Sequence, residues 1–233
     1  MIMEYKTLKS AQDAAGKISL GNGKMPGSTF PISATKCKVG GKLADVKGSV
    51  CNRCYALKLE KLRPSVNQGW LANYTKSTNL IDTNPDAWVA ACLFQIKRAY
   101  LKSGQPFHRW FDSGDLQSVA MLSAICKVAM GSPEISHWLP TRESAIVKLY
   151  RANGGSVPSN LVIRVSSTMV NDNPIANHVN TSTVHGKNSN HWGHACPASS
   201  PEHKAMDAGG KSNCGDCRAC WNPAIANISY PLH

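Results

Sequence analysis

Predicted strands and helices alternate along the middle of the chain, and this alternation constrains the fold more than any other feature. Asn84-Pro85 is a favourable helix start, and apolar residues recur at helical spacing from there to Gly104. Three strand candidates and the two helices between them follow, at about 107–111, 117–130, 135–139, 142–152 and 161–165. Such a pattern is typical of a parallel sheet with crossover helices.

We therefore expect a single α/β domain over residues 1–233, built as a small or partial (β/α) barrel with long irregular Cys-rich N- and C-terminal segments. The chain supplies too few strand–helix units for the eight of a full barrel. The polar residues 1–27 are predicted to be an irregular lead-in with one short helix near 11–16, before a short strand at 28–34 and a loop at 35–54. Residues 170–233 are predicted to be a loop-rich Cys/His metal-binding tail packed on the barrel.

Polar side chains follow the predicted strands where each strand ends. Asp112 and Asp115 come after one strand, and Arg142 and Glu143 come after the next. The carboxyl ends of parallel strands share one edge of a sheet, and active sites form there. These four residues are our candidates for catalysis, as acid–base groups or cation ligands. The alternative is structural, because Asp112 suits a turn, Asp115 suits a helix cap, and Glu143 suits a helix N-terminus.

The cysteine content favours metal binding over disulfides. The chain has nine cysteines, an odd number, and its start MIMEYKTLKS lacks the apolar region of a secretory signal. No apolar stretch of about 20 residues exists to span a bilayer. We therefore expect a reducing cytoplasm and no membrane association, and in that compartment metal ligation explains so many cysteines better than disulfides do.

The strongest metal signal is the run Cys214-x2-Cys217-x2-Cys220-Trp221 near the C-terminus. Three cysteines at two consecutive two-residue gaps match part of the bacterial ferredoxin pattern, so we expect an iron–sulfur cluster, with [4Fe–4S] the leading type. A zinc site would usually draw two cysteines from each of two knuckles. Zinc remains the alternative metal.

The remaining ligands come from other segments. Cys196-Pro197 is one candidate, and the pair Cys51-x2-Cys54 is another, with thirteen residues between Cys37 and that pair. Because these three N-terminal cysteines follow the first strand candidate, they should share the edge described above. One cluster joining both chain ends is favoured by the small size of the chain, and two separate sites are the other arrangement.

We expect simpler roles for the other two cysteines and for most of the histidines. Cys92 and Cys126 fall on the apolar faces of predicted helices, which favours core packing. Histidines gather late in the chain, at 178, 185, 191, 194 and 203. His191 or His194 could supply a ligand or a proton donor near Cys196, whereas the simpler interpretation is a set of polar loop histidines.

The net charge of +12 supports a second hypothesis, a metal-stapled basic module that contacts nucleic acid. The basic residues are scattered, and no specific nucleic-acid motif is visible. A structural zinc protein that acts on a host partner is a third hypothesis.

Several segments together resemble a bacteriophage family known as gene product 88, over about residues 20–225. They are Met25-Pro-Gly-Ser-Thr-Phe30, Ser49-Val-Cys-Asn-Arg-Cys-Tyr-Ala56, Phe111-Asp-Ser-Gly-Asp115, Trp138-Leu-Pro-Thr-Arg-Glu143, Cys196-Pro-Ala198 and the run 214–221. The resemblance implies a phage-encoded protein of the infected bacterial cytoplasm, with an iron–sulfur centre and a barrel-like fold. The partner that we expect is an unknown small molecule or a host redox partner.

The N-terminal cysteine loop is also similar to the three-cysteine loop of radical S-adenosylmethionine enzymes, in which one iron stays open to bind that cofactor. This similarity brings S-adenosylmethionine into consideration. The long gap between Cys37 and Cys51 departs from the tight spacing of those enzymes and gives S-adenosylmethionine no support.

Overall fold

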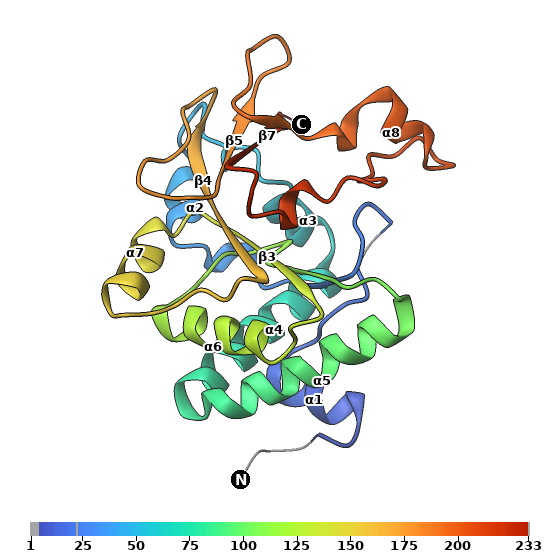
Figure 1. Cartoon of the computed structure of the whole chain (residues 1–233), viewed down its shortest axis with the longest axis vertical. Helices are drawn as coiled ribbons and strands as arrows, with labels where there is room; N and C mark the ends of the chain where they lie inside the picture. Colours follow the sequence, from blue (N-terminus) through green and yellow to red (C-terminus); the bar gives the residue numbers. More distant parts are fainter. Residues whose placement is uncertain (1–4, 22, 233) are drawn as a thin grey trace.

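The computed structural model describes residues 5–21 and 23–232. Within them, seven strands form one sheet in the order β1-β2-β3-β4-β5-β7-β6, and all neighbouring strands are parallel (Figure 1). The strands are β1 Ser28–Phe30, β2 Phe107–Trp110, β3 Ser136–Thr141, β4 Leu161–Val170, β5 Thr181–His185, β6 His194–Ala195 and β7 Asn227–Pro231. This arrangement confirms the α/β class with crossover helices and is consistent with a partial barrel.

The helices mostly connect the first four strands. They are α1 Leu8–Ala15, α2 Val39–Leu43, α3 Tyr55–Leu62, α4 Pro64–Thr83, α5 Pro85–Ser103, α6 Val119–Met130, α7 Ser144–Ala152 and α8 Pro201–Ala205, with short 3-10 turns η1 Ala34–Lys36, η2 Pro197–Ser199 and η3 Ala219–Trp221. The predicted ends of α5 are confirmed: the side chain of Asn84 accepts a hydrogen bond from the Ala87 N–H, and Gly104 closes the helix at φ 67°.

The two faces of the sheet have different partners. Trp110, Leu139 and Ile163 point into the main core with α5 and α6, where Trp88 is also buried. Alternate residues face the C-terminal tail, and Trp138 there lies 5.3 Å from Trp221 between ring centroids. In Figure 1, helices α1, α4, α5 and α6 gather on one side of the molecule and the red C-terminal tail lies on the other. The tail therefore covers the face of the sheet that the helices leave open.

The N-terminal region is more ordered than we expected. Helix α1 begins at Leu8, and its Ala11 and Ala15 are fully buried, so residues 5–21 belong to the packed domain. Residues 1–4 and 22 of the predicted lead-in lie outside the described residues. The segment 35–54 also departs from a continuous loop, because it contains α2.

Helices α3 and α4 were not predicted at all. The buried positions of α4 are Asn73, Ser77 and Ile81, so polar residues interrupt the apolar stripe that normally reveals a helix. Asn73 is buried because its side-chain amide donates to the carbonyl oxygens of Lys17 and Pro31. These contacts tie α4 to the segments on both sides of β1.

The tail is also more regular than predicted. Strand β4 continues to Val170, and β5, β6 and β7 all come from the segment predicted to be loop-rich. Thr181, Ser182 and Thr183 of β5 are buried polar residues, so no alternation of apolar and polar residues marks this strand. Helix α7 begins at Ser144, so Arg142 and Glu143 lie in the turn before it.

Candidate functional site

The three N-terminal cysteines lie together on the segment between β1 and α3. Gly40 shows how closely they pack: a Cβ at that position would stand 3.4 Å from Cys51 Sγ and 3.2 Å from Cys37 Cβ. Burial raises the pKa of the Cys37 thiol, and nearby Asp115, Cys54 and Cys51 raise it further, whereas Arg142 lowers it. We refer to Cys37, Cys51 and Cys54 as the N-terminal cysteine set.

Backbone and side-chain contacts fix this set at the carboxyl edge of the sheet. The Val39 N–H donates to Glu143 Oε1 at 2.8 Å, and Lys38 Nζ donates to the carbonyl oxygen of Gln117 at 2.7 Å. The Val50 N–H donates to the carbonyl oxygen of Thr168 on β4 at 2.9 Å. The cysteines therefore share the edge with the residues that follow β2 and β3, as the strand order suggested.

Asp115 holds two turns of this edge together. Its carboxylate accepts hydrogen bonds from Thr141 Oγ1 at 2.6 Å, from the Arg142 N–H at 2.9 Å and from the Leu116 N–H at 2.7 Å. Burial raises the pKa of Asp115 to about 6, and these hydrogen bonds oppose the rise. The helix cap that we considered for Asp115 belongs to Ser118 instead.

The other three candidate catalytic residues fall into two groups: one residue positions backbone, and two keep polar atoms without a partner among the described residues. Glu143 uses Oε1 to hold the Val39 N–H, so it positions the cysteine segment. Asp112 Oδ1 and Arg142 Nε are buried and have no hydrogen-bond partner among the described residues. Burial raises the pKa of Asp112, and Arg109 opposes that rise. Asp112 and Arg142 thus keep polar atoms that a ligand could satisfy, because a buried unpaired polar atom is costly.

The second group of thiols comes from the tail, and we call it the C-terminal cysteine set: Cys196, Cys214, Cys217 and Cys220. Cys196 interacts electrostatically with Cys214, Cys217 and Cys220, and Cys214 also interacts with Cys217. Burial raises the pKa of Cys196 and Cys214, and it raises the pKa of Cys220 to about 12. The segment at 196 and the run 214–220 are therefore brought to one place.

Polar groups surround this set. Cys220 Sγ lies 3.2 Å from the Tyr230 hydroxyl, and Cys217 Sγ lies 3.8 Å from His194 Nε2. Of the two histidines considered as ligands or proton donors, His194 therefore lies beside a cysteine of this set, Cys217.

Arg164 is the main anchor of the C-terminal set, and sequence reasoning missed it. Its side chain is 0% exposed on β4. The guanidinium donates to the carbonyl oxygens of Ala219, Cys220, Asn222 and Ile225, at 3.0, 3.1, 2.8 and 2.8 Å. The sequence does contain a sign of this role, because Arg164 is a charged residue inside the apolar run Leu161–Val165. An arginine buried there needs many hydrogen-bond acceptors.

The interactions between thiols described above join Cys37 to Cys51 and Cys54 in one set, and Cys196 to Cys214, Cys217 and Cys220 in the other. Arg109 lies between the sets, near Cys214 on one side and near Asp112 and Tyr55 on the other. Cys92 and Cys126 are buried in the apolar core, which confirms their predicted packing role.

Across residues 5–21 and 23–232, no three His, Cys, Asp or Glu side chains are arranged so that they could hold a single metal ion. The ligands of a [4Fe–4S] cluster bind four different iron atoms around a larger body. Cysteines that bind such a cluster can therefore lie farther apart than the ligands of a single ion.

Comparison with protein families gives the chain its assignment. The family model described as Gene product 88 matches residues 4–223. The chain belongs to the Gene product 88 family. The match confirms the resemblance seen in the sequence and supports the description of this Gene product 88 protein as a bacteriophage protein. No curated protein and no solved structure matches it. No helix in the part of the chain that the structure describes is long and apolar enough to cross a membrane.

Proposed function

We propose that this Gene product 88 protein binds an iron–sulfur cluster, most simply [4Fe–4S], through Cys196, Cys214, Cys217 and Cys220. The observation that carries the proposal is the gathering of four free thiols from two separate segments of the tail. Four cysteine thiolates are the usual ligand set of such a cluster. When bound, the cluster would supply one-electron chemistry, which fits a redox protein or an iron–sulfur enzyme in the infected bacterial cytoplasm.

The surroundings of the C-terminal set suit a negatively charged thiolate cluster. Arg164 and Lys24 lie within electrostatic range and favour ionised thiols, at Cys220 and Cys196 respectively. The Tyr230 hydroxyl can donate to Cys220 Sγ, and hydrogen bonds of this kind tune metal–thiolate sites. Metal binding requires ionised thiols. Burial raises the pKa of Cys196 and Cys220 and so opposes ionisation, and these partners offset part of that effect.

We further propose that the N-terminal cysteine set forms a second iron–sulfur site. Three thiolates would leave one iron without a protein ligand, and that iron could bind a small molecule. Asp112 Oδ1 and Arg142 Nε, which lack partners in the described part of the chain, belong to the same edge of the sheet. This site would make the protein an enzyme, whereas the C-terminal site alone would suit electron transfer.

The experiment is anaerobic purification of the full chain, followed by iron, sulfide and zinc analysis and electron paramagnetic resonance of the reduced protein. Iron and acid-labile sulfide in equal amounts, with the spectrum of a reduced cluster, are expected. Stoichiometric zinc without sulfide would reject the proposal in favour of a zinc protein, whose test is unfolding on chelation.

The charge of +12 keeps nucleic-acid contact as a second candidate function. That function predicts retention of DNA or RNA that weakens steeply as salt rises. Retention that does not change with salt would reject it.

A further inference from the structure

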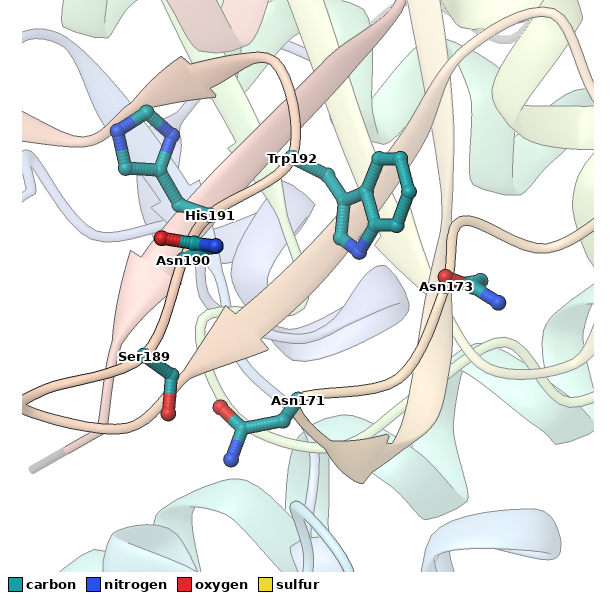
Figure 2. Close-up of a pocket in the computed structure, with 6 residues that line it drawn as sticks. All are labelled: Asn171, Asn173, Ser189, Asn190, His191 and Trp192. Carbon is teal, nitrogen blue, oxygen red and sulfur yellow. The ribbon is translucent and has the colours of Figure 1, made fainter.

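A hollow lies at the carboxyl ends of β4 and β5, and none of the residues that line it belongs to either cysteine set. It has a volume of about 570 Å³ and lies between the turn after β4 and the loop after β5. Its lining consists of Asn171, Asn173, Ser189, Asn190, His191 and Trp192 (Figure 2). In parallel α/β folds this edge of the sheet is where ligands bind.

The lining is uncharged and rich in groups that both donate and accept hydrogen bonds. Figure 2 shows the indole of Trp192 reaching over the space between the two loops, with the Asn171 amide on the side of Ser189 and the His191 ring turned away. Asn171 Oδ1 accepts the Gly186 N–H at 2.7 Å, which fixes the amide so that its NH2 group remains for a ligand. An uncharged lining disfavours a ligand held mainly through its own charge.

Trp192 is an exposed aromatic side chain on a firmly held backbone. Its side chain is about half accessible, at 51%. Its carbonyl oxygen accepts Asn227 Nδ2 at 2.8 Å, and the same amide group donates to Thr183 Oγ1 at 3.0 Å. Gly193 adopts φ 61° against β7, where a Cβ would stand 2.6 Å from the carbonyl oxygen of Asn227. The sheet therefore holds the backbone that carries the indole in place before any ligand arrives, which reduces the entropic cost of ordering this loop on binding.

We propose that this hollow binds a nucleobase, which stacks on Trp192 and is read along its edge by the amides of Asn171, Asn173 and Asn190. A base is a flat, neutral ring with donors and acceptors in its plane, and asparagine amides pair with such edges. Aromatic side chains that stack bases are the usual means of holding them outside a duplex. The overall charge of +12 would favour the phosphates attached to the base.

The base could come from a free nucleoside or nucleotide, or from single-stranded nucleic acid, and both present the same flat ring. This inference is independent of the iron–sulfur proposal, because none of the lining residues belongs to either cysteine set. Its failure would leave the iron–sulfur proposal untouched, and the reverse is also true.

The test is equilibrium dialysis of the anaerobically purified full chain against the four common nucleosides, their monophosphates and a short single-stranded oligonucleotide. The variants are Trp192→Ala, Trp192→Phe and Asn190→Ala. Leu101→Ala is the matched control, since Leu101 is an apolar side chain that is 74% exposed on α5 and far from the hollow in sequence and fold. Circular dichroism verifies that each variant is folded.

We expect Trp192→Ala to weaken binding by about 5-fold to 100-fold, from the usual energy of base stacking on an aromatic ring. Trp192→Phe should restore part of the loss, and Leu101→Ala should change nothing. Binding of nucleosides alone would identify a small-molecule site, and binding that requires the oligonucleotide would identify a single-strand site. No binding by any base, or equal binding by Trp192→Ala, would overturn the proposal.

Discussion

Arg164 Nε donates a hydrogen bond to the carbonyl oxygen of Cys220 at 3.1 Å, and so joins the middle of the sheet to the last cysteine of the C-terminal set. The same guanidinium holds the carbonyl oxygens of Ala219, Asn222 and Ile225. One buried side chain therefore shapes the whole turn that carries Cys220. The geometry of the proposed cluster site depends on a residue that is not a ligand.

Replacing Arg164 tests that dependence. Arg164→Met should lower the free energy of unfolding by at least about 3 kcal/mol, because several buried carbonyl oxygens lose their donors at once. It should also lower iron content, since the turn at Cys220 is no longer held. Urea unfolding and iron analysis measure the two effects. Retention of both stability and iron would show that the turn forms without the arginine.

Tyr230 is expected to tune the C-terminal site. Its hydroxyl lies 3.2 Å from Cys220 Sγ, and a hydrogen bond to a ligand sulfur stabilises the reduced, more negative cluster. Tyr230→Phe should therefore lower the reduction potential while iron content stays near that of the wild type. Tyr150→Phe is a suitable control, because the Tyr150 hydroxyl donates to the carbonyl oxygen of Ser156 on the helical side. A potential unchanged in Tyr230→Phe would exclude this contact as a tuning group.

Gly40 and Gly41 are neighbours in α2 and provide a matched pair of variants. A Cβ at residue 40 would crowd Cys37 Cβ at 3.2 Å and Cys51 Sγ at 3.4 Å, whereas a Cβ at Gly41 would meet no described atom within 4 Å. Gly40→Ala should displace the N-terminal cysteine set and reduce metal bound there. Gly41→Ala should leave metal content unchanged and stabilise the protein by up to about 1 kcal/mol through helix propensity. Equal metal content in the two variants would contradict the crowding argument.

His137 and His108 make stability depend on pH. Their rings lie 5.5 Å apart, and burial lowers the pKa of His137 to about 3 and that of His108 well below its ordinary value. The unfolded chain, whose histidines titrate near 6.5, therefore binds more protons than the folded chain below that pH. The free energy of unfolding should fall as pH drops below about 6.5, by up to about 1.4 kcal/mol per pH unit for each histidine.

Asp115 has the opposite effect. Its pKa is raised from 3.8 to about 6, so the folded chain binds more protons than the unfolded chain between these pH values. The contribution of Asp115 therefore lowers the free energy of unfolding as pH rises through that range. A comparison of variants separates the two effects. His137→Gln should flatten the slope of unfolding free energy between about pH 7 and pH 5, measured by urea titration. An unchanged slope would mean that His137 is protonated at a similar pH in both states.

The sequence predicted some of these features for identifiable reasons. Asn84-Pro85 and Gly104 bound α5 because cap residues act locally. The meeting of the Cys37 segment with Asp115 and Arg142 followed from strand order alone, since parallel strands end at one edge.

Other features depend on contacts that no local pattern reveals. Asn73 and Ser77 occupy buried positions of α4, so the helix lacks a continuous apolar stripe in the sequence. Thr181, Ser182 and Thr183 are buried in β5, so that strand lacks a recognisable apolar pattern. Arg164 lies within an apolar strand, and only the returning tail supplies its acceptors. The positions of α4, β5 and Arg164 depend on their tertiary partners, so local sequence patterns do not predict them.

The central claim is that the C-terminal cysteine set holds an iron–sulfur cluster. The most direct test compares iron and acid-labile sulfide per chain in the wild type, in the triple Ser variant of Cys214, Cys217 and Cys220, and in Cys92→Ala as the core control, all prepared anaerobically. The account predicts a loss of about four iron and four sulfide in the triple variant, as for one [4Fe–4S] cluster, and none in Cys92→Ala. Full retention of iron and sulfide by the triple variant would contradict it.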